Sequence, residues 1–367
     1  MGDAVRKTVV ISAVNIRKGG TLTILRDCLR SASALCPDCR VIALVHDRSL
    51  CDFPGIEYVE MPDTIKSWSR RLWCEYVTMR KLSLKFGPVH LWLSLHDTTP
   101  RVKAEHRAVY CQTSFPFLKP KIQDLVFDPK IFLFTLFTRF AYRIGVHSND
   151  YLISQTGWFR TGLSEMLSFP SEKIIVFPPE RSSSGLDTSV PPKPQFIFPA
   201  TPDCHKNFEV LCEAARLLEA ELGKGRFKVV LTINGTENRY SRWLRRKWGN
   251  VESIDFHGFV SREALASLYS ESAALVFPSR VETWGLPISE YSSLQRPMIL
   301  ADLPYAHETA SGCSAVSFFN PDDPKALASR MKAVLDADLS LFSDVSQTVA
   351  ESPSVEDWRS LFGLLGV

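Results

Sequence analysis

The sequence predicts an α/β protein built from two doubly wound domains, each with a parallel sheet covered on both faces by helices. Short apolar runs alternate with helix-like segments along the first half of the chain, and the same alternation restarts in the second half. A break rich in Pro and Ser separates the two halves. The chain has 367 residues and is 45% hydrophobic and 23% charged, which fits a globular protein with two cores.

The first domain is expected over residues 1–180. Each apolar run in it is followed by a helical segment, and the first helix begins after the turn that holds Gly19 and Gly20. Because strands that alternate with helices pair in parallel, the sheet should be buried on both faces. The strand-like runs are residues 9–14, 41–45, 56–59, 90–95, 108–111 and 174–177, with helices at about 68–86, 121–141 and after 156.

A linker is expected over residues 181–194, where Pro, Ser and charged residues gather. Residues 351–367 should form a C-terminal helix that starts at a Ser354-x-x-Asp357 capping pattern and can cross back to the first domain. The second domain lies between them over residues 195–350, with strand-like runs at 196–198, 229–233, 254–256, 274–277, 298–300 and 316–319.

Charge and cysteine content favour a cytoplasmic protein without a nucleic-acid partner. The 43 basic and 40 acidic residues give a net charge of only +3, too balanced for a nucleic-acid coat. The nine cysteines are odd in number and scattered, as in a reducing compartment. Cys36-Pro37-Asp38-Cys39 closes a helical pattern and lacks a second ligand pair, so we expect no metal or redox site there. The longest apolar run, residues 131–137, is too short to span a bilayer.

Ligands of open α/β sheets bind beyond the carboxyl ends of the strands, so two such domains should face each other across a central cleft. The first turn, residues 17–21, has Gly19 and Gly20 but lacks the G-x-G-x-x-G fingerprint, and the chain has no Walker A motif. Redox and P-loop functions therefore lose support. The two glycines still permit an anion at the helix start, although an ordinary tight turn explains them equally well.

The strongest local pattern follows the strand at 274–277. Glu282 precedes a helix start, Gly285 allows a close backbone approach, Pro287 suits the first helical turn, and Glu290 lies inside the helix. Backbone N–H groups at such a start can hold phosphate, and carboxylates accept hydrogen bonds from sugar hydroxyls. A helix start with a solvent-facing glutamate is the equally weighted alternative.

Residues 282–290 read E-T-W-G-L-P-I-S-E, which resembles the E-x7-E signature of the large retaining glycosyltransferase family 4, of the GT-B fold. Residues 256–265 and 150–156 resemble two further segments of that family, in the same order along the chain. Residues 199–207 resemble the P-x-H-K-N turn of members that act in bacterial O-antigen and capsule synthesis.

The resemblance implies a role for each matching residue. Glu282 would lie beside the reacting carbon of the donor sugar, and Lys206 would neutralise the diphosphate; these two are the candidate catalytic residues. Glu290 would bind the ribose hydroxyls, and the backbone of 283–286 would meet the sugar and diphosphate. The implied donor-binding residues are Gly19, Gly20, Asn207, Gly235, Thr236, Thr283, Trp284, Gly285, Leu286 and Glu290.

Two positions depart from the family pattern. Ala200-Thr201 stands where many members have an arginine that faces the diphosphate, so Arg280 or another basic residue has to supply that charge if Lys206 does not suffice. Gln112 stands where many members have a histidine, and it can donate a hydrogen bond but cannot titrate. His96, Asp97 and Gln112 are the candidate acceptor-side residues, although a His-Asp pair is also typical of a capped strand end.

Neither a D-x-D motif nor a metal-ligand cluster lies near the candidate pocket, so we expect no cofactor and a metal-independent reaction. The implied reaction is retaining transfer of a hexose or deoxyhexose, such as mannose or rhamnose, from a nucleotide sugar to a glycan acceptor, expected to be lipid-linked and part of a cell-surface polysaccharide. A catalytically weak nucleotide-sugar-binding subunit that supports a partner transferase stays open as an alternative. A nucleotide-sugar epimerase also stays open, although the glutamate motif disfavours it.

Peripheral membrane contact is a further expectation. Residues 66–73 combine Trp and Arg at helical spacing, and Lys119 and Lys121 precede a Phe-rich helix at 132–140. Basic and aromatic helices of this kind can lie in a bilayer interface. The alternative is a helix packed on the sheet, with its Trp residues inside and its Arg residues outside.

Overall fold

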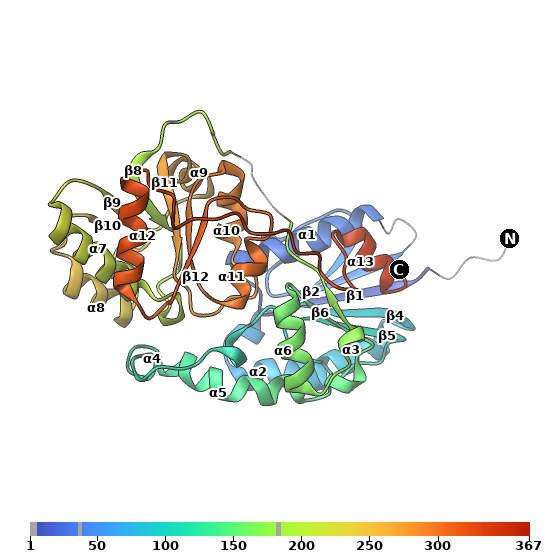
Figure 1. The fold of residues 1–367 in the computed structure, drawn as a ribbon. Helices are drawn as coiled ribbons and strands as arrows, with labels where there is room; N and C mark the ends of the chain where they lie inside the picture. Colours follow the sequence, from blue (N-terminus) through green and yellow to red (C-terminus); the bar gives the residue numbers. More distant parts are fainter. Residues whose placement is uncertain (1–5, 36–38, 181–184) are drawn as a thin grey trace. The chain divides into compact units, whose positions relative to one another are not determined.

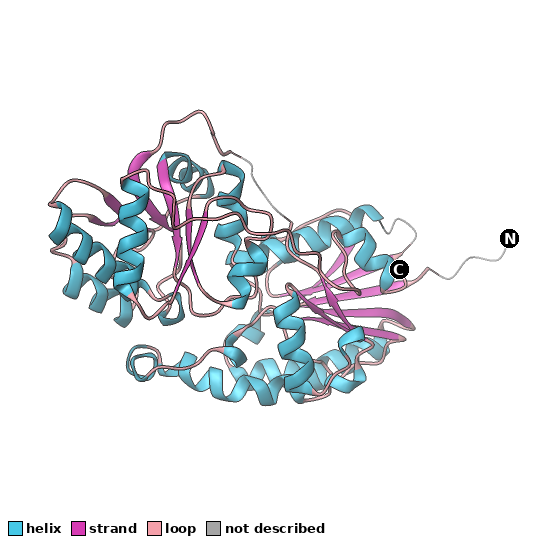
Figure 2. Ribbon diagram, viewed as in Figure 1, coloured by secondary structure: helices cyan, strands magenta, loops and turns pink. Residues whose placement is uncertain are grey.

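A computed structural model describes residues 6–35, 39–180 and 185–367. The chain divides into two compact units, which we call unit 1 (residues 1–113, 137–180 and 350–367) and unit 2 (residues 114–136 and 181–349). Each unit is a parallel sheet between layers of helices (Figure 1, Figure 2), which confirms the predicted fold class. Residues 36–38 of the CxxC sequence and 181–184 of the expected linker lie outside the described residues.

The sheet of unit 1 has the strand order β3-β2-β1-β4-β5-β6-β7, and its described pairings are all parallel. The order turns back between β1 and β4, as in doubly wound folds, where ligands bind at this switch point. The strands are β1 (Thr8–Ala13), β2 (Arg40–Val45), β3 (Ile56–Glu60), β4 (Val89–Ser94), β5 (His106–Tyr110), β6 (Tyr151–Ser154) and β7 (Ile174–Val176).

Both faces of this sheet are buried. One face packs against α1 (Gly19–Leu35) and α13 (Trp358–Leu364), where Trp358 stacks on Tyr110. The other face packs against the π-helical turn η3 (Cys74–Thr78), which follows α2 (Trp68–Trp73), and against α3 (Met79–Lys85). Apolar runs buried on two sides explain why the strands read as continuous hydrophobic stretches. Helix α6 (Gly157–Leu167) connects β6 to β7, and α5 (Pro129–Arg143) has residues in both units.

Unit 2 repeats the scheme with the order β10-β9-β8-β11-β12-β13, again parallel in every described pairing. Its strands are β8 (Lys193–Phe198), β9 (Lys228–Leu231), β10 (Ile254–Phe256), β11 (Ser272–Phe277), β12 (Met298–Ala301) and β13 (Val316–Phe319). Its helices are α7 (Phe208–Leu222), α8 (Arg239–Trp248), α9 (Arg262–Glu271), α10 (Leu286–Tyr291), α11 (Pro304–Thr309) and α12 (Pro324–Leu335). Helices α7, α8 and α12 lie side by side (Figure 1).

Residues 114–136 pack with unit 2, although they precede the linker in the sequence. Helix α4 (Ile122–Phe127) supplies Asp124, whose carboxylate pairs with the Arg280 guanidinium at 2.5 Å. Both side chains are buried, at 1% and 7% exposure. Phe127 packs on Trp243 of α8 with 4.9 Å between ring centroids. The sequence alone places this segment in the first domain, because local patterns do not reveal which core an amphipathic helix joins.

The Asp124–Arg280 pair gives a stability prediction. Asp124→Ala leaves a buried guanidinium without its counter-ion, which should lower the free energy of unfolding by about 3 kcal/mol or more. Urea unfolding of the full chain measures this loss, and the double variant Asp124→Ala/Arg280→Met should recover part of it. Lys121→Ala is the matched control, because the exposed Lys121–Asp322 pair should contribute about 1 kcal/mol or less. A loss in Asp124→Ala no larger than in Lys121→Ala would contradict the burial argument.

Candidate functional site

The two candidate catalytic residues form an ion pair at the carboxyl edge of the unit 2 sheet. Lys206 ends the turn η7 (Cys204–Lys206) after β8, and Glu282 lies in the loop after β11. Because β8 and β11 are neighbours, their carboxyl ends lie side by side. Lys206 Nζ lies 2.6 Å from Glu282 Oε1, and the two side chains are 16% and 15% exposed. A cation and a carboxylate are thus held together, and both side chains are mostly buried with a small part of their surface accessible to solvent.

Asn207 fixes the loops around this pair. Its backbone is left-handed, with φ of 61°, and its side-chain amide donates to the carbonyls of Pro278 (3.2 Å) and Pro321 (2.7 Å). The Arg280 N–H donates to the His205 carbonyl at 2.7 Å. Asn207 therefore ties together the loops after β8, β11 and β13, and its amide hydrogens are committed to backbone carbonyls.

His205 lies next to Lys206 and is buried. Burial lowers the pKa of His205 well below 6.5, and the neighbouring charges of Lys206 and Arg280 lower it further. The imidazole is therefore neutral at pH 7. Because Arg280 is buried and engaged with Asp124, Lys206 is the more accessible cation of these two loops among the described residues.

Gly285 permits the sharp turn from the Glu282 loop into α10. Its φ is 94°, and a Cβ there would lie 3.3 Å from Ile288 Cδ1 and 3.4 Å from Phe277 Cε1. Trp284 points inward, where its indole N–H donates to Ser289 Oγ at 3.1 Å and its carbonyl accepts from Thr309. The Trp284 ring is therefore buried inside unit 2, and the backbone role expected of residues 283–286 stays a prediction.

Glu290 lies on α10 and is partly buried. Tyr269 of α9 donates its hydroxyl hydrogen to Glu290 Oε2 at 3.1 Å. Burial raises the pKa of Glu290 above its ordinary value of 4.5, although Tyr269 and Arg262 oppose this shift. The Tyr269 hydroxyl thus fixes the position of the Glu290 carboxylate.

Gly235 and Thr236 form the turn after β9. Gly235 has φ of 86°, and a Cβ there would lie 2.6 Å from Arg245 Cδ, so only glycine fits against α8. Glu237 accepts the N–H groups of Asn234 and Gly235, at 2.6 and 3.0 Å. The turn thus places its backbone directly beside the arginines of α8.

The acceptor-side candidates of unit 1 are mostly engaged in holding strand ends. Asp97 has φ of 70°, and its Oδ1 accepts the N–H groups of Gln112 (2.5 Å) and Thr113 (2.9 Å) and the hydroxyl of Tyr142 (2.8 Å). The Gln112 amide donates to the Leu95 carbonyl at 2.8 Å. Gly19, at the start of α1, faces open space.

His96 is buried in a polar network that the sequence does not reveal. Glu75, fully buried in the π-helical turn η3, lies 3.5 Å from the His96 ring and accepts from Arg71 (2.8 Å) and Thr98 (2.7 Å). Ser12 lies 3.1 Å from His96 Nε2. Burial lowers the pKa of His96 below 6.5, although the Glu75 carboxylate favours its protonation. A one-residue helical bulge has no signal in the sequence, so Glu75 cannot be predicted as the partner of His96 from the sequence alone.

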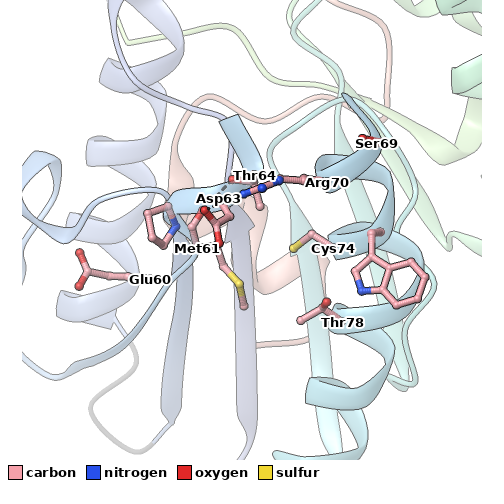
Figure 3. Close-up of a pocket in the computed structure, with 10 residues that line it drawn as sticks. Glu60, Met61, Asp63, Thr64, Ser69, Arg70, Cys74 and Thr78 are labelled. Atoms are coloured by element: carbon pink, nitrogen blue, oxygen red, sulfur yellow. Dashed lines mark hydrogen bonds and ion pairs between the residues drawn. The ribbon is translucent and has the colours of Figure 1, made fainter. Parts of the chain in front are cut away.

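Unit 1 also has a pocket of about 610 Å³ beyond the carboxyl end of β3. Glu60, Met61 and Asp63 line one wall, and Ser69, Cys74 and Thr78 line the helical wall (Figure 3). Arg70 crosses the pocket mouth to pair with Asp63 at 3.1 Å, and Trp73 borders it with 65% of its surface exposed. Carboxylates, a guanidinium and an indole are groups that bind sugars. The sequence pattern does not predict this pocket.

The tryptophans of α2 face outward. Trp68 and Trp73 are 55% and 65% exposed, whereas the Arg71 side chain is turned inward to Glu75. The arrangement with Trp inside and Arg outside is therefore wrong for these residues. Helix α5 also exposes apolar side chains, namely Leu133, Leu136, Phe137 and Phe140. No helix within the described residues is long and apolar enough to cross a membrane.

Comparison with known proteins identifies the domain that holds the Lys206–Glu282 pair. Residues 193–337 match the family model described as "Glycosyl transferases group 1". The protein carries a glycosyltransferase group 1 domain. The matched region contains Lys206, Glu282 and Glu290, so the glycosyltransferase resemblance read from the sequence is confirmed at the level of this family.

The glycosyltransferase is 22% identical over 292 residues to the O-antigen chain mannosyltransferase RfbU of Salmonella typhimurium, which covers 76% of this chain and 77% of the relative. Its fold resembles the apo lipopolysaccharide outer core galactosyltransferase WaaB, with a TM-score of 0.62, 12% identity and 91% of each chain covered. WaaG, a glycosyltransferase involved in lipopolysaccharide biosynthesis, aligns with a TM-score of 0.61 at 15% identity, over 90% of this chain and 93% of that one. The GT-B fold is thereby confirmed.

The raised pKa of Glu290 predicts a pH-dependent stability difference. A carboxyl whose folded pKa lies above its unfolded value stabilises the fold below the unfolded value, and loses that contribution as pH rises through the folded value. Glu290→Gln keeps a partner for Tyr269 and cannot ionise. The variant should therefore gain free energy of unfolding relative to the wild type as pH rises from about 4.5 towards 8. Urea unfolding at several pH values measures this gap; a gap that stays constant or narrows with rising pH would contradict the burial argument.

Proposed function

We propose that this glycosyltransferase moves a hexose or deoxyhexose from a nucleotide diphosphate sugar to a glycan acceptor with retention of configuration. The Lys206–Glu282 ion pair is the observation that supports this best, because it joins a phosphate-binding cation to a sugar-binding carboxylate at 2.6 Å. Glu290 lies on α10, eight residues after Glu282, where its carboxylate suits ribose hydroxyls.

The ion pair has to open for the reaction to proceed. A donor diphosphate carries more negative charge than one carboxylate, so Lys206 Nζ would exchange Glu282 for phosphate oxygens on donor binding. The bond between the anomeric carbon and the phosphate oxygen then breaks, and Lys206 stabilises the charge on the leaving diphosphate. Glu282, released from Lys206, would sit beside the cation-like sugar. The acceptor oxygen bonds to the anomeric carbon on the same face, and its proton passes to the departing phosphate.

We further propose that no divalent ion takes part. Among the described residues, His, Cys, Asp and Glu do not gather in groups of three or more that could hold a metal. Lys206 would supply the charge that a metal provides in other transferases. Metal independence remains a proposal, and chelation tests it directly.

The names of the relatives support a saccharide acceptor. One curated relative is an O-antigen chain mannosyltransferase; one similar structure is a lipopolysaccharide outer core galactosyltransferase, and another is a glycosyltransferase involved in lipopolysaccharide biosynthesis. A lipid-linked cell-surface glycan is therefore the acceptor that we propose, and the pocket bordered by Asp63, Arg70 and Trp73 is its proposed binding place in unit 1. The outward aromatic side chains of α2 and α5 would lie in the bilayer interface, at the cytoplasmic face, while the pocket holds the sugar.

A catalytically weak subunit that binds a nucleotide sugar for a partner transferase is the second candidate. The absence of an arginine at Ala200-Thr201 favours it, because one cation near the diphosphate is missing there. Turnover separates the two candidates, since such a subunit would bind donors without transferring the sugar.

Replacing either member of the ion pair should stop the reaction while the fold survives. Lys206→Ala and Glu282→Ala should each lower donor turnover by about a hundredfold or more, because each removes charge stabilisation that is used in the transition state. A panel of nucleotide sugars, with donor hydrolysis and thermal stabilisation as readouts, measures this. Lys193→Ala, which breaks an exposed ion pair with Glu271, should stay near the wild type.

The same panel tests metal independence, because added EDTA should leave wild-type turnover unchanged. Near-normal turnover in both Lys206→Ala and Glu282→Ala would overturn the site assignment. Donor binding without turnover in the wild type would favour the non-catalytic subunit.

Two variants separate the acceptor pocket from the membrane face. Asp63→Asn, in the pocket but on neither α2 nor α5, should lower transfer to a glycan acceptor while donor hydrolysis by water persists. Phe137→Ser/Phe140→Ser should reduce co-sedimentation with phosphatidylglycerol vesicles without changing donor hydrolysis. Val349→Ser, which removes an exposed apolar side chain outside these helices, is the control for vesicle binding. Equal vesicle binding by the wild type, Phe137→Ser/Phe140→Ser and Val349→Ser would contradict the membrane proposal.

A further inference from the structure

Helix α8 concentrates positive charge to a degree that the net charge of +3 hides. Its ten residues, R-Y-S-R-W-L-R-R-K-W, include five basic residues and no acidic one. Arg239, Arg242, Arg245 and Arg246 line a hollow of about 530 Å³, together with Phe127 and Gly235. All four arginines are exposed, and none of them is paired with a carboxylate among the described residues.

The basic side chains of α8 repel one another. Arg239 is the first helical residue, and Arg242, Arg245 and Arg246 follow it at spacings of three and four. Like charges at these spacings repel each other, and Arg239 at the N-terminus opposes the helix dipole, whereas Arg245 and Arg246 in the last turn are favoured by it. The mutual repulsion of the guanidinium groups falls once an anion lies between them.

The hollow is built by neighbouring contacts. Gly235 lacks the Cβ that would collide with the Arg245 side chain, and Arg245 donates to the Asn234 carbonyl at 2.9 Å. The Arg245 guanidinium lies over the Phe256 ring at 5.3 Å. Phe127 forms an aromatic wall, held by its packing on Trp243. Arg242 and Arg245 each use one donor on a backbone carbonyl of the Gly235 turn, which leaves their other guanidinium donors for a ligand.

We propose that this hollow, which we call the α8 arginine site, binds a phosphate ester that carries two or more negative charges. Guanidinium groups bind phosphate oxygens in pairs, and the volume fits a nucleotide-sized ligand rather than a flat surface. The site begins at the Gly235-Thr236 turn, on the same edge of the sheet as Lys206. Arg280 cannot serve there, because it is buried against Asp124.

Two sources can supply this phosphate. One is the diphosphate of the donor, and this assignment rests on the proposed function. The other is an anionic lipid headgroup, since α4, the helix that ends at Phe127, exposes the apolar side chains of Ile122, Leu125 and Val126. Phosphate binding by α8 itself depends on neither assignment.

Calorimetric titration of the full chain with pyrophosphate, UDP, GDP and phosphatidylglycerol vesicles tests the site. Arg242→Gln/Arg246→Gln should weaken binding of at least one of these probes by about tenfold or more. Lys247→Gln, on the same helix but outside the hollow, should change binding less than twofold. Without ligand, the double variant should melt at the same temperature as the wild type or higher, because its arginines no longer repel. A loss caused by misfolding would instead lower the melting temperature.

The probes assign the source. Loss for UDP and GDP indicates the donor, and loss confined to the vesicles indicates the lipid headgroup. The titrations are repeated in a Lys206→Ala background, in which the proposed catalytic cation is absent. If the proposed function is wrong, pyrophosphate should still bind to the α8 arginine site. Failure of the inference would appear as pyrophosphate, nucleotide and vesicle binding that Arg242→Gln/Arg246→Gln leaves unchanged.

Discussion

The ion pair between Lys206 and Glu282 is the interaction on which the candidate site depends. Its members come from loops after neighbouring strands, so the pair forms only because β8 and β11 lie side by side. Asn207 and Gly285 hold those loops in left-handed conformations that few other residues adopt. The pair keeps both charges satisfied in the free protein. A diphosphate bound as we propose would displace the Lys206–Glu282 contact.

The arginines of unit 2 differ in what their charges do: some are buried in ion pairs that stabilise the fold, and others are exposed to solvent and can contact a ligand. Arg280 is buried against Asp124 and fastens residues 114–136 to the second unit, although this segment comes from the first half of the sequence. The arginines of α8 are exposed and close to the turn at Gly235. A count of Lys and Arg cannot separate these roles, because burial and partners decide them. Charge therefore acts here through position and not through its total.

The alternation of apolar runs was enough to predict both parallel sheets, since strands buried on two faces have a direct sequence signal. The spacing of Glu282 and Glu290 likewise marked the loop and helix that hold them. Long-range packing was not predictable in this way. The buried partner of His96, the pocket between Asp63 and Trp73, and the outward tryptophans of α2 each depend on one helix meeting another part of the chain. The π-helical turn at Glu75 changes the helix face by one residue, which periodicity cannot detect.

A crystal structure of the protein with a bound nucleoside diphosphate tests the central claim most directly. We expect Lys206 Nζ to move from Glu282 to a phosphate oxygen. Glu290 should accept hydrogen bonds from the ribose hydroxyls, and the fold of unit 2 should otherwise stay unchanged. A nucleotide bound away from the carboxyl edge of β8 and β11, or bound there with the Lys206–Glu282 pair intact, would contradict the central claim.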